Sequence, residues 1–277
     1  MRRSSSRAVL YTGILGIGIL AGLAGPALAD PDLANNTTPT PGTDIMLELG
    51  AAARVAPAFP GADNYTLYPA PIIKLRFLKL PIFGTVADSS KNVGLGLYPA
   101  FNFEGERDAA DHSELRGLRT VKWAIELGAG VRYTGDFVEA YAEVRRGFNG
   151  HHGFVGELGI DAVARPSDRL KLKLGPRLSF ADSEYMSTYF GVSSGEATAS
   201  GGRLSAYDAG GGFRDMGLQF GAEYAWSDRI TLYGDAGYRR LVGDAADSPI
   251  VKRAGSENQF TAGLGLTYRF SWNVDGK

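Results

Sequence analysis

The segment with the most direct potential for chemistry is residues 191–195, which read GVSSG. They match G-x-S-x-G, the pattern in which a strained strand-to-helix turn presents a nucleophilic serine on a parallel sheet. The surrounding sequence predicts no such sheet, and none of the histidines, His112, His151 and His152, has a clear triad position. We interpret Ser193 as a loop serine and expect no catalytic residue. A barrel hydrolase that loses its esterase activity on Ser193→Ala is the alternative.

Metal and phosphate sites are also not expected. His151 and His152 are adjacent, and neighbouring side chains on a strand point to opposite faces, which makes a poor chelate. The G-x-G pairs at 94–96, 128–130 and 263–265 lie within alternating segments with no helix after them, so they are not phosphate loops. We predict no metal and no cofactor.

Acidic and basic residues recur at every second position of long alternating segments. Nine acids and nine bases share the polar face of these segments. The equal numbers of acidic and basic residues favour a cross-linked network around a narrow lumen over an ion-selective pore. The residues predicted to form this network are Glu126, Arg132, Glu139, Glu143, Arg145, Glu157, Asp161, Lys171, Lys173, Arg177, Glu223, Asp235 and Arg239, with Glu48, Glu104, Arg54, Lys74 and Arg76 on the same face.

The segments that carry these charges alternate with a period of two, as β-strands do. In residues 122–134, Trp123, Leu127 and Tyr133 fall on one face, and Glu126 falls on the other. Equivalent strands are predicted at 45–56, 67–78, 92–104, 122–134, 136–148, 153–165, 169–180, 216–226, 229–241 and 258–270.

A soluble sandwich also alternates, but strand length and aromatic spacing favour a membrane barrel. The predicted strands have 11 to 14 residues, whereas a globular strand has about 5 or 6 and a tilted membrane strand needs about 9 to 11. Trp123 and Tyr133 are ten residues apart on the apolar face, as are Phe260 and Phe270. At a tilt near 40°, ten residues cover about 25 Å, the distance between the two aromatic girdles of such barrels.

Loop lengths give the topology. Short turns near 135–136, 166–168 and 227–228 alternate with longer links at 105–121, 183–205 and 242–256. Outer-membrane barrels place short turns in the periplasm and long loops outside. We therefore predict an all-β, closed antiparallel transmembrane barrel of about ten strands, because unpaired strand edges are costly in hydrocarbon. Residues 79–91 are long for an inner turn and contain strand-like LPIFGTVA, so twelve strands are the alternative.

The remaining composition fits export to the outer membrane. Arg2, Arg3 and Arg7 precede an apolar run and an A-x-A site, which predicts a signal peptide over 1–29 rather than a membrane anchor. A flexible periplasmic segment at 30–43, a barrel at 44–270 and a tail at 271–277 should follow. Loss of three arginines changes the net charge from -1 to -4, too little to indicate a nucleic-acid partner, and the chain has 0 cysteines.

Several stretches resemble the MipA/OmpV family of Gram-negative outer-membrane proteins. The residues that carry the resemblance are 183–192 (SEYMSTYFGV), 200–201, 212–215 (GFRD), 240–251 (RLVGDAADSPIV), 263–270 (GLGLTYRF) and, more weakly, 55–63. The chain departs from the family by continuing after Phe270 and by having Phe59-Pro60 where a Tyr-Glu pair is usual.

The resemblance implies an outer-membrane barrel that links a lytic transglycosylase of the MltA type to a bifunctional penicillin-binding protein. A narrow channel, an adhesin or an osmotic-response protein that acts through outer loops is the alternative. Within the family-specific run, Gly243, Asp244, Asp247, Ser248 and Pro249 are predicted to form an outer loop with Asx-type turns that folds over the barrel mouth. A ligand site in that loop is the other interpretation.

Overall fold

The computed structural model describes residues 42–80, 84–88, 94–109 and 115–273, and their main feature is one antiparallel sheet. Neighbours in the sheet follow the order β3-β2-β1-β11-β10-β9-β8-β7-β6-β5-β4. The strands are β1 (Ile45–Pro57), β2 (Tyr65–Leu80), β3 (Gly84–Asp88), β4 (Gly94–Glu104), β5 (Ala124–Thr134), β6 (Val138–Asn149), β7 (Phe154–Ser167), β8 (Leu170–Ala181), β9 (Gly212–Ala225), β10 (Ile230–Leu241) and β11 (Asn258–Trp272).

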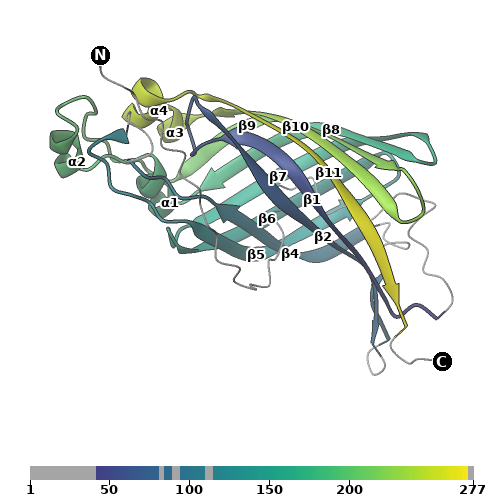
Figure 1. Ribbon diagram of the computed structural model, residues 1–277. Helices are drawn as coiled ribbons and strands as arrows, with labels where there is room; N and C mark the ends of the chain where they lie inside the picture. The colour runs from purple at the N-terminus through teal and green to yellow at the C-terminus, as the bar shows by residue number, and fades with distance from the viewer. Residues whose placement is uncertain (1–41, 81–83, 89–93, 110–114, 274–277) are drawn as a thin grey trace, which may run out of the picture.

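The first and last long strands are joined along their length. β1 pairs with β11 from Ile45↔Trp272 to Val55↔Ala262. Every other ladder joins strands that follow one another in the sequence. The sheet therefore curls into a barrel in which the first and last long strands, β1 and β11, meet at one seam (Figure 1).

The predicted strands are confirmed with small shifts at their ends. Each of the ten predicted segments corresponds to one long strand, and the 79–91 segment adds β3, a five-residue strand. The barrel was predicted to end at Phe270, but β11 continues through Ser271 and Trp272 because these residues pair with Met46 and Ile45. The predicted signal peptide at 1–29 and almost all of the segment at 30–43 lie outside the described residues.

One junction differs from the predicted full closure. β4 and β3 stand at the two ends of the strand order, and no ladder among the described residues joins β4 to β2 or β3. Ala58 N–H donates to the Asn64 carbonyl (3.0 Å), so alternate residues of β2 bond to β1 and the residues between them face the gap. Pro69 and Pro71 are among the β2 residues that face the gap, and a proline has no N–H to donate.

A proline also faces the gap from the other side. Gly135 N–H donates to the Val138 carbonyl (2.8 Å), which fixes the odd-numbered residues of β5 as those bonded to β6. The even-numbered residues of β5 therefore bond to β4, and Pro99 points toward the gap. Prolines on both edges explain why this junction does not form a regular ladder.

The outward face of the barrel is apolar and has aromatic residues near both ends. On β11, Phe260 and Phe270 are exposed at opposite ends, with Leu264 (75% exposed) and Leu266 between them. On the opposite face of that strand, Thr267 is buried. Other exposed aromatic side chains near the two ends are Phe103, Trp123, Phe148, Phe154 and Phe213 at one end, and Tyr133, Phe137, Tyr224, Trp226 and Trp272 at the other. This distribution matches two girdles around a band of hydrocarbon.

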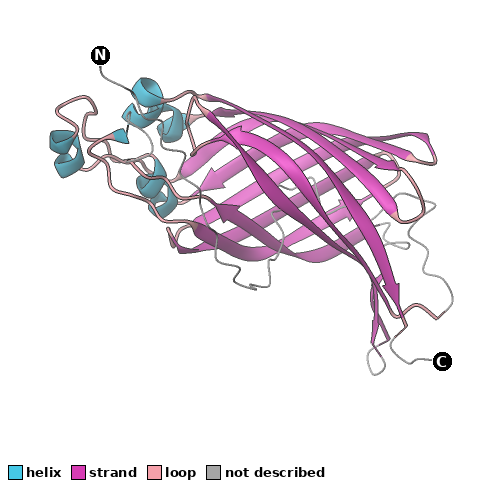
Figure 2. Ribbon diagram, in the orientation of Figure 1, coloured by secondary structure: helices cyan, strands magenta, loops and turns pink. Residues whose placement is uncertain are grey.

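The two ends of the barrel differ in structure. The described residues form four helices, which lie together at one end (Figures 1 and 2): α1 (Ser183–Tyr189), α2 (Ser194–Ala199), α3 (Gly243–Asp247) and α4 (Pro249–Ala254). No helix in the described part of the chain is long and apolar enough to cross a bilayer. The short turns lie at the opposite end, which is the periplasmic end by the usual rule. The helices therefore form an outer cap.

The lipid face gives a depth-dependent prediction. Leu264→Arg should destabilise the barrel by about 2–4 kcal/mol because it places a charge near the bilayer midplane, whereas Phe137→Arg, in an interfacial turn, should cost about 0–1 kcal/mol. Denaturant unfolding in liposomes, followed by tryptophan fluorescence, measures both. Equal costs at the two positions would mean that hydrocarbon does not cover this face.

Candidate functional site

The interior of the barrel is filled by ion pairs. The thirteen charged residues predicted for the lumen all lie on the strands, and each is buried or half-buried. Twelve of them form ion pairs with one another or with other interior residues. The remaining one, Arg132, stacks over the ring of Tyr98 at 4.7 Å. The structure therefore brings the predicted set together.

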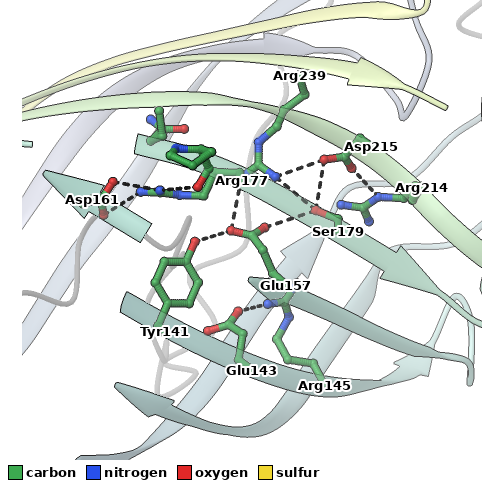
Figure 3. A network of polar contacts seen from close by, with 12 residues as sticks. Tyr141, Glu143, Arg145, Glu157, Asp161, Arg177, Ser179, Arg214, Asp215 and Arg239 are labelled. Atoms are coloured by element: carbon green, nitrogen blue, oxygen red, sulfur yellow. Dashed lines mark hydrogen bonds and ion pairs between the residues drawn. The ribbon is translucent and has the colours of Figure 1, made fainter. Parts of the chain in front are cut away.

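Glu157 is the centre of the largest cluster (Figure 3). Its carboxylate accepts hydrogen bonds from the Tyr141 hydroxyl and from Arg239 (3.2 Å). Arg239 also donates to Asp215 (3.0 Å) and to the Ser179 hydroxyl (3.0 Å). One carboxylate and one guanidinium thus connect strands β6 to β10 across the interior.

A second cluster lies on β5 and β6, close to the outer cap. Arg145 donates to Glu126 (2.9 Å) and to Glu143. The Tyr98 hydroxyl donates to Glu143 (2.6 Å). His151, predicted to be a poor metal ligand, is buried with Nε2 3.2 Å from the Glu126 carboxylate. Its position indicates a structural role below the cap.

Two further clusters lie on β6, β7 and β8. Glu139 accepts from both Lys171 (2.8 Å) and Lys173 (2.7 Å). Asp161 pairs with Arg177 (2.8 Å). Each acid on one strand faces a base on a nearby strand, which is the arrangement that a low-dielectric interior requires.

Strands β1 and β2, on the other side of the β1–β11 seam, contribute further ion pairs, including Arg54–Asp235 (3.0 Å). Glu48 accepts from Arg76 (3.0 Å) and from Arg269 (2.8 Å). Lys74 of β2 reaches Glu223 of β9 (3.4 Å), although three strands separate β2 from β9 in the sheet. Such a contact requires the sheet to curl until opposite walls meet.

These side chains leave little free space. The enclosed cavity among Asp161, Arg177, Glu223 and Asp235 measures about 10 Å³, roughly the space that one water molecule requires. The described part of the interior therefore resembles a packed polar core more than a water-filled pore. The arrangement of these ion pairs supports structural stabilisation of the sheet.

Part of this network was not predicted from the sequence. Tyr98 and Tyr141 face inward and bond to acids, and the alternation of Tyr141 with Glu139 and Glu143 could have revealed it. Asp215 was missed because the predicted strand began at Met216, whereas β9 begins at Gly212 and Asp215 has the same inward alternation as Glu223.

The outer cap has an apolar core of its own. Tyr185, Met186, Tyr189 and Phe190 of the α1 segment are fully buried and cluster with Val251 of α4. A neighbouring cluster joins the segment after β1 to α4 and to the links that follow β4, α1 and α2, through Phe59, Leu115, Leu118, Val192, Leu204 and Ile250. The two most family-like stretches thus meet in one folded layer over the barrel mouth.

The predicted loop motif forms helices instead of an irregular loop. Gly243 begins α3 with φ of 54°. Asp244 accepts from the distant Gly210 N–H (2.7 Å), and Asp247 pairs with Lys252 (2.6 Å). Ser248 is the N-cap of α4, accepts from Ile250 N–H and donates to the Phe190 carbonyl (2.6 Å), and Pro249 is buried in the first turn. The motif connects cap segments, and the Asx-turn expectation is wrong for Asp244, whose partner is distant in sequence.

Arg107 binds the C-terminal end of helix α1. Arg107 is buried and donates to the Tyr189 carbonyl (2.7 Å) at the end of that helix. Burial lowers the pKa of Arg107 to about 10, and the nearby Arg119 cation adds to this effect. Cations near the last carbonyls of a helix are stabilising, so Arg107 ties the cap to the link after β4.

Ser193 has a structural partner. It is the N-cap of α2, and its hydroxyl bonds to the Glu196 carboxylate (2.7 Å) in a capping box. Of the predicted histidines, His151 is engaged below the cap, His152 is exposed, and His112 lies outside the described residues. The described residues contain no group of three or more acidic, His or Cys side chains arranged to hold a metal.

Comparison with known proteins gives a family and partial relatives. The family described as "MltA-interacting protein MipA" matches residues 49–270. Outer membrane protein OmpV of Vibrio cholerae is 39% identical over 93 residues, and Omp26La of Vibrio anguillarum is 38% identical over 93 residues. Each match spans 34% of this chain and 34% of the relative, about a third of its length.

Solved barrels of the outer membrane are also similar in part. A structure of Salmonella typhi OmpF gives a TM-score of 0.37 with 11% sequence identity, and the match covers 83% of this chain and 98% of that one.

The central cluster gives a stability prediction. Glu157→Gln should destabilise the barrel by about 3–5 kcal/mol, because it leaves the buried Arg239 without half of its counter-charge. The exposed pair Arg240–Glu257 is a matched control, and Arg240→Ala should cost less than about 1 kcal/mol. Denaturant unfolding in detergent micelles measures both. Similar small effects for the two variants would contradict the assigned role of the network.

The cap gives a pH prediction. Partial burial raises the pKa of Glu196, but hydrogen bonds from Arg119 N–H and from Ser193 outweigh it and hold this pKa below its ordinary value of 4.5. A lowered pKa stabilises the fold above the ordinary value, and the contribution is lost as the pH falls through the lowered one.

Exchange of the Arg119 and Ser193 amides should therefore accelerate between pH 5 and pH 3 relative to amides of the barrel. In Glu196→Gln the same amides should already exchange fast at pH 6, with little further pH dependence. Identical exchange profiles in the two proteins would overturn this account of the cap.

Proposed function

The chain belongs to the MipA family of MltA-interacting proteins and is a β-barrel of the Gram-negative outer membrane, and from this premise we propose that it is a scaffold for peptidoglycan-remodelling enzymes. In this proposal a lytic transglycosylase binds at the periplasmic rim. A bifunctional penicillin-binding protein joins the same assembly.

The filled interior is the observation that most favours this proposal. Ion pairs such as Arg239–Glu157 and Lys74–Glu223 occupy the space that a channel would need. The apolar cap covers the outer mouth. A barrel whose interior is crossed by such ion pairs acts most simply through contacts at its surface, and the family description supplies the class of partner.

The experiment is retention of the enzyme by the purified barrel. The immobilised barrel in mild detergent should retain a purified lytic transglycosylase of the MltA type, and an unrelated outer-membrane barrel should not. Arg119→Ala, which alters only the outer cap, should leave retention unchanged. Failure of the native barrel to retain the enzyme would reject the scaffold role.

An outer cleft favours a second candidate, an adhesin or other protein that acts through its external surface. The cleft measures about 610 Å³ and is lined by Arg119, Ser193, Ser194, Tyr207 and Asp208. Host-cell binding that is lost in Arg119→Ala would support this function. A large, ion-selective conductance in planar bilayers would instead support a channel and contradict the packed interior.

A further inference from the structure

Four strands extend beyond the periplasmic rim of the barrel. The turn between β9 and β10 closes with Ser227 N–H donating to the Ile230 carbonyl (3.1 Å), and Ile230 pairs with Tyr268. β11 continues four residues further, to Trp272, and stays paired with β1. β2 extends with them and carries β3 on its other side. Figure 2 shows the β2–β3 hairpin and the end of β11 projecting past the other strands.

This projection, which we call the rim extension (Ile45–Glu48, Lys74–Leu80, Gly84–Asp88 and Arg269–Trp272), is firmly attached to the barrel. Arg76, Glu48 and Arg269 form a buried ion-paired cluster on its inner face. On its outer face, Phe270 and Trp272 stack with ring centroids 5.6 Å apart, and both remain partly exposed. The extension is therefore an ordered surface outside the short turns.

The free edge of the rim extension is β3. It pairs with β2 and stands at the end of the strand order, with no further strand beside it in the described residues. Lys79 N–H donates to the Asp44 carbonyl (2.7 Å), so Lys79 and Phe77 bond toward β1. Their partners on β3, Thr85 and Asp88, consequently direct their N–H and carbonyl groups away from β2.

The edge strand β3 differs in proline content from the strand edges inside the membrane. Pro69, Pro71 and Pro99 remove donors where β2 and β4 face their gap, whereas β3 contains no proline. In the periplasm water can satisfy a free edge until another strand replaces it. A proline-free edge of this kind is the usual acceptor for strand addition by a partner.

We propose that the partner enzyme docks by adding an extended segment to the free edge of β3. The inference rests on the proposed scaffold function and names its binding surface. Main-chain hydrogen bonds to Thr85 and Asp88 would supply the affinity for the bound segment. The other inner turns, such as Ser227–Ile230, are tight and offer no comparable edge.

The test uses Thr85→Pro in the full-length protein, with Thr85→Ala as the matched control. The proline removes an N–H that faces away from β2, so no bond within the sheet is lost, and the alanine keeps that N–H. Retention of purified MltA-type lytic transglycosylase should fall at least tenfold for Thr85→Pro and stay unchanged for Thr85→Ala. Equal retention by native protein and Thr85→Pro would overturn the docking site while leaving the scaffold function intact.

Amide exchange in the native protein provides a second measurement that does not depend on folding of the variant. Exchange of the Thr85 and Asp88 amides should slow on addition of the enzyme, and no change there would also overturn the site. If the native barrel retains no enzyme at all, the scaffold function itself fails. If light scattering shows a dimer of the barrel alone that Thr85→Pro dissociates, the occupant is a second copy of this chain and the proposal is wrong.

Discussion

The whole structure depends on the need to pair backbone N–H and carbonyl groups where no water can reach them. Hydrocarbon offers no hydrogen bonds, and each unpaired group there costs several kcal/mol. The antiparallel ladders from β2 to β11 and from β11 to β4 meet this need, and the pairing of β1 with β11 joins the first and last long strands. The only junction without a ladder among the described residues is bordered by Pro69, Pro71 and Pro99, residues that could not complete one.

A curled sheet with lipid outside must place its polar residues inside, and this requirement shapes the interior. Burial of a charge is tolerated when a partner of opposite sign is close. The contacts of Glu157 with Arg239 and of Lys74 with Glu223 satisfy that condition across several strands. The α1 and α4 segments pack together over the outer mouth and leave the surfaces at the two ends of the barrel outside this polar interior.

Much of the sheet could be predicted from the sequence because alternation is a local pattern. The strand predicted at 229–241 is observed as Ile230–Leu241, and the inward position of Glu157 follows from the same period of two. Features that depend on distant residues could not be predicted. Asp244 bonds to Gly210, which lies 34 residues away, and the missing ladder beside β4 becomes visible only when the strand order is known.

The pairing of β1 with β11 also bears on biosynthesis. β11, which pairs with β1, follows the other described strands in the chain, so a chain truncated before Asn258 would expose the edges of both β1 and β10. Two exposed edges are costly in hydrocarbon, so stable insertion requires β11 to be in place.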